Sequence, residues 1–164
     1  RVHRDVSAEN VLVFDLDPVE TAANGGDSVR LALADYGLSV ELPAPCEDGS
    51  PGLLGGGTLA GKPSYMAPEQ VAGGDYDPVA ADIYSLGVVL FALSTGSAMY
   101  TSPSAADRAF GCVRRGQIRA LVTHWRLDGR FTPAGLDLLV AMMAVNPADR
   151  PSAEQVLNSE FLFD

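Results

Sequence analysis

The chain has 164 residues, 47% of them hydrophobic, and its 11 basic against 21 acidic side chains give a formal net charge of −10. That length and apolar content suit one buried core of ordinary domain size. Nucleic acids and anionic membranes bind basic surfaces, so the acidic balance argues against both as partners. The longest apolar run, residues 86–93, is too short to cross a bilayer. Cys46 and Cys112 form neither a disulfide framework nor a metal spacing, so we expect an intracellular, cytoplasmic protein, with the nucleus left open.

The first ten residues contain a pattern of side chains that could take part in a chemical reaction. His3-Arg4-Asp5 is followed by Asn10, with four residues between the aspartate and the asparagine. A carboxylate can take a proton from a hydroxyl group, and an amide oxygen can bind a metal ion. An aspartate and an asparagine in a loop also make ordinary turn hydrogen bonds. The octapeptide alone leaves both interpretations open.

Two short strands are predicted next, at residues 11–14 and 29–33, because both runs are apolar or β-branched. The residues between them, 15–28, read as a solvated insertion. The second strand runs into Asp35-Tyr36-Gly37, which taken alone is also common turn chemistry. The stretch 35–69 that follows is rich in proline and contains the run Gly55-Gly56-Gly57, a composition that favours mobility over packing.

The second half of the chain predicts helices. Asp77-Pro78 supplies an N-cap and a first-turn proline, and Gly96 ends a helix over residues 78–95 that is apolar on nearly every side. This helix should therefore be the buried centre. Further helices are predicted over 104–115, over 132–145 and after the capping box at 152–155, so that residues 132–164 form the C-terminal helices.

Five segments, in this order, resemble the motifs of the protein kinase family: 3–10, 35–37, 61–69, 82–87 and 146–151. The likeness covers residues 1–164 and is to the carboxy-terminal lobe alone. It implies a mainly α (α+β) fold, a helical bundle with a short β-hairpin that carries the catalytic and magnesium-binding loops. Residues 1–10 would then be the catalytic loop and 35–69 the activation segment.

The resemblance also implies roles for single residues. Asp5 would be the general base, and Asn10 and Asp35 would hold Mg²⁺ on ATP. Asp82 would bind the backbone of the catalytic loop, although a polar residue in the first turns of a helix is also common there. The resemblance also implies structural roles for His3 and for Tyr36, which replaces the family's phenylalanine. Glu69 and Arg150 would form a buried ion pair.

One pair of residues departs from the family. Serine/threonine kinases usually have a lysine two positions after the catalytic aspartate and a threonine after the glycine of the substrate segment, where this chain has Ser7 and Lys62. The two side-chain types are exchanged. Lys62 could supply the same charge from the opposite side with Ser7 as its hydrogen-bond partner, or the site could be partly degenerate.

Thr58 stands where many regulated kinases carry an activating phosphate, and Arg4 where such kinases bind it. A phosphate can order a loop by pairing with arginine, so we expect regulation by the enzyme itself or by an upstream kinase. The alternative is an unmodified loop threonine.

The likeness implies a kinase that phosphorylates serine and threonine of proteins, because the tyrosine-kinase signatures are absent from 5–10 and 61–69. The glycine-rich loop, strand lysine and helix glutamate of the small lobe are not in this chain, so we expect little phosphate transfer without that lobe. The rival function is a pseudokinase or scaffold that binds a protein partner.

Overall fold

The computed structural model describes residues 1–16, 18, 29–42, 44–47, 49–56 and 60–162. The described part is mainly helical with one two-stranded sheet, as the sequence predicted. Most of the predicted insertion at 15–28 and the candidate phosphorylation site Thr58 lie outside the described residues.

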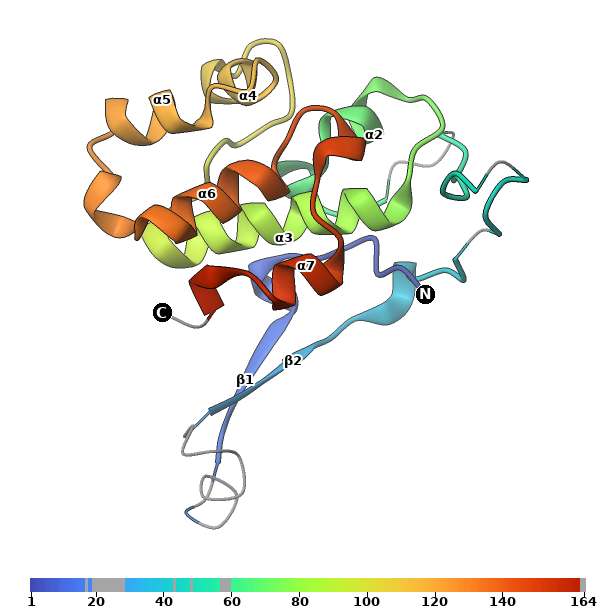
Figure 1. The fold of residues 1–164 in the computed structure, drawn as a ribbon, viewed down its shortest axis with the longest axis horizontal. Coiled ribbons are helices and arrows are strands. Elements are labelled where there is room, and N and C mark those ends of the chain that lie inside the picture. Colours follow the sequence, from blue (N-terminus) through green and yellow to red (C-terminus); the bar gives the residue numbers. More distant parts are fainter. Residues whose placement is uncertain (17, 19–28, 43, 48, 57–59, 163–164) are drawn as a thin grey trace.

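The sheet is an antiparallel hairpin of β1 (Val11–Asp15) and β2 (Val29–Leu33). Val11 pairs with Leu33 and Asp15 with Val29, so the residues before β1 and after β2 meet at one end. Both strands extend from the helical body (Figure 1). The catalytic-loop candidates and the Asp35 turn therefore lie together at the base of the hairpin, where it joins the helices.

The core is built around α3 (Pro78–Thr95), the helix that the sequence placed over the same residues. Asp77 caps it by accepting hydrogen bonds from the N–H groups of Val79 and Ala80, and Gly96 ends it with a φ of 73°. Ten of its residues are buried. By length and composition α3 is apolar enough to span a membrane, but here it is the central helix of the fold, packed against α6 and the segments that surround it.

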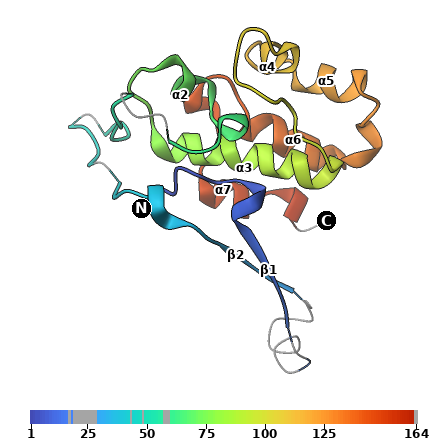
Figure 2. The ribbon, with the colours of Figure 1, turned by 180° about the vertical axis from the view of Figure 1, so that it is seen from behind.

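α2, α4, α5 and α6 lie on the side of α3 away from the hairpin, whereas α7 lies on the hairpin side (Figures 1 and 2). α6 (Pro133–Met142) lies along α3, while α4 (Arg108–Val113) and α5 (Ile118–His124) form an outer layer. α2 (Pro68–Ala72) and α7 (Ala153–Leu157) are short, and α7 has the predicted capping box, in which Ser152 and Gln155 bond each other's backbone. Six 3₁₀ turns complete the described elements: η1 (Ala8–Asn10), η2 (Tyr36–Leu38), η3 (Pro63–Tyr65), η4 (Asp128–Arg130), η5 (Pro147–Asp149) and η6 (Glu160–Leu162).

Two predicted helices are shorter than expected. α4 begins at Arg108 and not at residue 104, because the Asp107 carboxylate caps Ala109 and Phe110 while also accepting the N–H and hydroxyl of Thr101. α6 ends at Met142 and not at residue 145; the Arg150 side chain donates to the carbonyl of Ala144 just beyond this end.

α5 was not predicted from the sequence. Its N-cap residue, Gln117, makes no side-chain cap bond, and the left-handed residue that follows its end is Arg126, with a φ of 58°. The N–H of Arg126 donates to the Thr123 carbonyl and that of Leu127 to the Val122 carbonyl, the bonding of a helix end usually formed with glycine. The sequence therefore contained no recognisable signal for the start or the end of this helix.

Candidate active site

The loop of residues 3–10 is fixed to the core by one carboxylate. Asp82, in the first turns of α3, accepts the backbone N–H of His3 at 2.7 Å and that of Arg4 at 2.9 Å. Burial raises the pKa of the Asp82 carboxyl, and the two backbone hydrogen bonds oppose that rise. Arg4 has a φ of 67°, a backbone conformation that costs an L-residue about 1–2 kcal/mol and needs such anchoring.

His3 connects this loop to the turn after β2. Its Nε2 lies 3.0 Å from the carbonyl oxygen of Ala34, and its ring packs edge-on against the ring of Tyr36 with centroids 4.8 Å apart. His3 is buried and thus holds the residues on either side of Asp35. Asp35 itself is in the left-handed region with a φ of 64°, and its carboxylate accepts the N–H of Gly37.

Asp5 and Asn10 contact each other directly. The Asn10 amide nitrogen donates to the Asp5 carbonyl oxygen at 2.8 Å and to its carboxylate at 2.9 Å. The amide group is thereby oriented, and its oxygen is left as an acceptor. The backbone carbonyl of Asn10 accepts the N–H of Ala34, so Asn10 lies beside the residue that precedes Asp35.

The side chain of Lys62, near the C-terminal end of the stretch 35–69, also contacts Asp5 and Asn10. Its ammonium nitrogen lies 2.8 Å from the Ser7 hydroxyl, 3.3 Å from the Asp5 carboxylate and 3.5 Å from the Asn10 amide oxygen. Its backbone N–H also donates to the second carboxylate oxygen of Asp5 at 3.1 Å. Ser7 is fully buried, whereas about a third of the Lys62 side chain is exposed. One cation thus contacts three polar side chains of the loop, those of Asp5, Ser7 and Asn10.

Gly61 makes this approach of the two segments sterically possible, a role that the sequence analysis did not assign. Its φ is 97°, and a Cβ atom there would lie 2.5 Å from the backbone carbonyl oxygen of Arg4. Any side chain would push Lys62 away from Asp5 and Ser7. The only signal in the sequence was the glycine immediately before the lysine.

The segment after Lys62 is attached to the core by its carbonyl groups. The Ser85 hydroxyl donates to the carbonyl of Tyr65 at 2.8 Å, and the Tyr100 hydroxyl donates to that of Met66 at 3.2 Å. Tyr84 and Tyr100 share a hydroxyl–hydroxyl contact, and burial raises the pKa of Tyr100 to about 12, so both remain protonated donors at neutral pH. Ser85 lies in the segment 82–87 but had no predicted role, and Tyr100 was missed because an isolated hydroxyl residue has no distinctive pattern.

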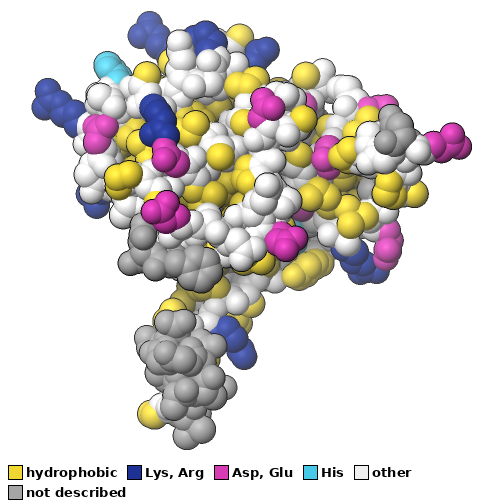
Figure 3. Space-filling model, in the orientation of Figure 1, with side chains coloured by type: hydrophobic (Ala, Val, Ile, Leu, Met, Phe, Trp, Pro, Cys, Tyr) yellow, Lys and Arg dark blue, Asp and Glu magenta, His cyan; other side chains and the backbone are white. Residues whose placement is uncertain are grey.

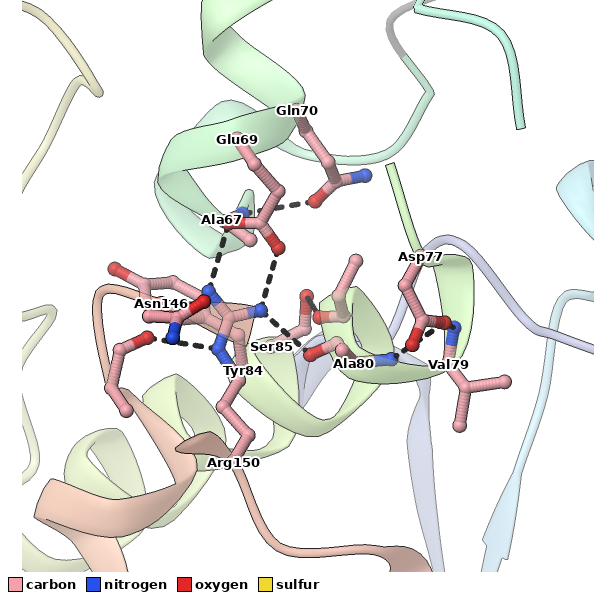
Figure 4. A network of polar contacts seen from close by, with 12 residues as sticks. Ala67, Glu69, Gln70, Asp77, Val79, Ala80, Tyr84, Ser85, Asn146 and Arg150 are labelled. Carbon is pink, nitrogen blue, oxygen red and sulfur yellow. Dashed lines mark hydrogen bonds and ion pairs between the residues drawn. The ribbon is translucent and has the colours of Figure 1, made fainter. Parts of the chain in front are cut away.

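Glu69 and Arg150 form a two-pronged ion pair (Figure 4). The guanidinium nitrogens lie 2.6 and 2.8 Å from the two carboxylate oxygens, and further bonds reach the carbonyls of Ala80 and Ala144. The guanidinium also lies over the Tyr84 ring. Only 1% of the Arg150 side chain and 17% of the Glu69 side chain are exposed. The pair therefore joins α2, α3 and the segment before α7.

The oxygen groups beside this site suit Mg²⁺, which proteins usually bind through one or two carboxylates and substrate phosphates. Asn10 offers its amide oxygen and Asp35 an exposed carboxylate that accepts one hydrogen bond, from Gly37. Among the described residues no cluster of three or more His, Cys, Asp or Glu side chains is placed to hold a metal ion.

Comparisons with known proteins decide the family. A family model described as the protein kinase domain matches residues 1–162. The chain belongs to the protein kinase family. Members of this family use ATP and Mg²⁺, and Asn10 and Asp35 of this kinase chain are compatible with the metal.

Several similar proteins are named as serine/threonine-protein kinases. The chain is 33% identical to pkn3 of Myxococcus xanthus over 159 residues, which are 97% of this chain and 27% of that protein. It is 36% identical to PknL of Mycobacterium tuberculosis over 150 residues, 91% of this chain and 32% of that protein. With DCLK3 of Mus musculus the identity is 32% over 162 residues, 98% of this chain and 18% of that protein. The kinase chain thus spans less than a third of each of these relatives.

Replacing Glu69 by alanine should destabilise the fold by about 3–5 kcal/mol, because the Arg150 guanidinium would remain buried without its counter-charge. Glu41→Ala provides the control, since Glu41 pairs with Arg1 at the surface and such pairs contribute about 0–1 kcal/mol. Urea unfolding followed by circular dichroism measures both values. Equal decreases in the free energy of unfolding for the two variants would show that burial does not increase the contribution of the Glu69–Arg150 pair to stability.

Proposed function

We propose that this chain is the larger, carboxy-terminal lobe of a protein kinase that phosphorylates serine and threonine residues of proteins. The observation that carries the proposal is the meeting of Lys62 with Asp5, Ser7 and Asn10 within hydrogen-bond distance. The relatives named as serine/threonine-protein kinases support the substrate class. Residues 1–10 would be the catalytic loop and residues 35–69 the activation segment.

In this proposal Asp5 orients the substrate hydroxyl and accepts its proton. Its carboxylate has the backbone N–H and the ammonium of Lys62 on its two oxygens, so its position is fixed before substrate binds. Asn10 and Asp35 would hold Mg²⁺, and ATP, when bound, would supply the phosphoryl group that is transferred. Because the transition state spreads negative charge over the phosphoryl oxygens, a nearby cation lowers its energy.

Lys62 is proposed as that cation, in place of the lysine that the family usually carries at the position of Ser7. The Ser7 hydroxyl lies 2.8 Å from the ammonium and is fully buried, so it can fix the lysine in one position. The short separations favour compensation over degeneration, because a degenerate pair has no reason to remain in contact. The exchange would thus preserve one positive charge at the site.

The proposed reaction is tested on the natural gene product that carries this chain, incubated with radiolabelled ATP, Mg²⁺ and a library of serine, threonine and tyrosine peptides. We expect label on serine and threonine, and a decrease of the order of 10²–10⁴-fold for Asp5→Asn because the proton acceptor is lost. Asp15→Asn, an exposed aspartate at the end of β1, should leave the rate unchanged. The 164-residue chain alone should transfer little phosphate.

Label on tyrosine would overturn the substrate class. A natural gene product that binds a protein partner but transfers no phosphate would instead be a pseudokinase. Robust transfer by the 164-residue chain alone would contradict its assignment as one lobe of a two-lobed enzyme.

Lys62→Met should lower the transfer rate by about 10²–10³-fold, because the charge beside the transferred phosphate is lost. The double variant Ser7→Lys, Lys62→Thr restores the usual family arrangement and should recover much of that rate. Arg30→Met removes an exposed cation from β2 and should have no effect. Single-turnover kinetics measure all three; an unchanged rate for Lys62→Met would rule out compensation.

Thr58 is proposed as a regulatory phosphorylation site, with Arg4 as one of the groups that bind its phosphate. Thr58→Ala should then reduce the activity of the natural gene product severalfold, and mass spectrometry should find phosphate on Thr58 of the active enzyme. Thr21→Ala, in the predicted insertion, serves as the control. Full activity of Thr58→Ala would end the proposal without affecting that for Asp5 and Lys62.

A further inference from the structure

The basic residues of this chain are concentrated in one segment. Residues 108–130 contain six arginines and one aspartate, a formal charge of +5, whereas the rest of the chain has five basic against 20 acidic residues, a charge of −15. We call 108–130 the arginine segment; it comprises α4, α5 and η4. An acidic protein thus carries one strongly basic region.

The six arginines of this segment are exposed, and most of them form no ion pair within the described part of the chain. Dark blue side chains gather over α4 and α5 in Figure 3, while the acidic ones are spread over the remaining visible surface. Arg119 pairs with Asp137, and Arg115 donates to Gln117 and Cys112. In the described part of the chain the other four make no ion pair: Arg108, Arg114, Arg126 and Arg130.

A groove lined by five apolar residues and one arginine adjoins this segment. It has a volume of about 100 Å³ and lies between α2 and α4, where it is lined by Pro68, Val71, Ala72, Pro103, Phe110 and Arg114. A cavity of about 150 Å³ holds benzene, so this hollow suits one small apolar side chain. Arg114 belongs both to the groove and to the arginine segment, so one ligand can contact the two features together.

Asp107, the residue before the arginine segment, has its carboxylate bonded by donors of its own chain. The carboxylate of Asp107 accepts the backbone N–H groups of Ala109, Phe110 and Thr101 and the Thr101 hydroxyl. Burial raises the pKa of this carboxyl, but these hydrogen bonds outweigh burial and lower it, so the group is ionised at neutral pH. No carboxylate lines the groove.

We propose that the arginine segment and the groove dock an acidic segment of another protein, with one apolar side chain of that segment in the groove and its carboxylates on Arg114 and other exposed arginines of the segment. This surface binds its partner independently of phosphate transfer. Charge screening limits electrostatic attraction to about 8 Å at physiological salt, so a short acidic segment is attracted locally without meeting the rest of the acidic surface.

The overall charge makes other occupants less suitable. DNA and anionic membranes present extended negative charge, which the rest of the chain, with a formal net charge of −15, would repel. Two copies of the chain, at −10 each, repel one another. A groove for a single side chain matches a peptide, whereas it adds nothing to binding of nucleic acid or lipid headgroups.

The test uses the purified protein and a fluorescein-labelled peptide of alternating glutamate and serine with one central leucine, followed by fluorescence anisotropy. Replacing that leucine by serine should weaken binding about tenfold through loss of apolar burial. The charge reversals Arg108→Glu and Arg114→Glu together should weaken binding by at least roughly tenfold. Raising NaCl from about 50 to about 300 mM should also weaken it.

Arg30→Glu makes the same change of charge on the hairpin and should leave peptide binding unaltered, and thermal melting checks that each variant is folded. Equal binding of a matching lysine peptide, or no binding of the acidic peptide at millimolar concentration, would overturn the proposal. So would tighter binding of duplex DNA or phosphatidylserine vesicles. A dimer in sedimentation equilibrium that Arg114→Glu dissociates would assign the surface to a second copy instead.

Discussion

The carboxylate of Asp82 is the contact on which the rest of the site depends. It is placed by α3, the most buried helix, and accepts the N–H groups of two consecutive loop residues, His3 and Arg4. These bonds hold Arg4 in the left-handed backbone conformation and so fix the position of Asp5, the next residue of the loop. Burying a carboxylate is unfavourable, as its raised pKa shows, and the hydrogen bonds to the loop offset that cost.

The same helix also positions the second half of the site. Ser85 of α3 bonds the Tyr65 carbonyl, Tyr84 contacts Tyr100, and the carbonyl of Ala80 accepts from Arg150. Through these contacts the segment after Lys62 has a fixed position relative to the loop that α3 also holds. The distance between Lys62 and Ser7 is therefore a property of one rigid core element and not of two independent loops. Gly61 permits the final close approach.

Positive charge is found in two separate regions of the fold that the proposed functions would use. Around Asp5 one lysine contacts a carboxylate, a hydroxyl and an amide, while the outer layer of α4 and α5 concentrates the exposed arginines. The two regions lie on different elements, with η3, α2 and α3 between Lys62 and α4 in sequence. Catalysis and partner binding, as proposed, would thus use separate positive charges on an acidic surface.

The amino-acid sequence by itself determined the local features: the two strands, α3 with its Asp77 cap and Gly96 end, and the capping box of α7. These follow from side-chain periodicity and from hydrogen bonds between residues a few positions apart. It did not reveal α5, whose end is formed by Arg126 where glycine is usual, or the late start of α4, which depends on Thr101 bonding Asp107. It suggested that Ser7 and Lys62 belong together, but only tertiary packing decided that they lie 2.8 Å apart, because 55 positions of chain separate them.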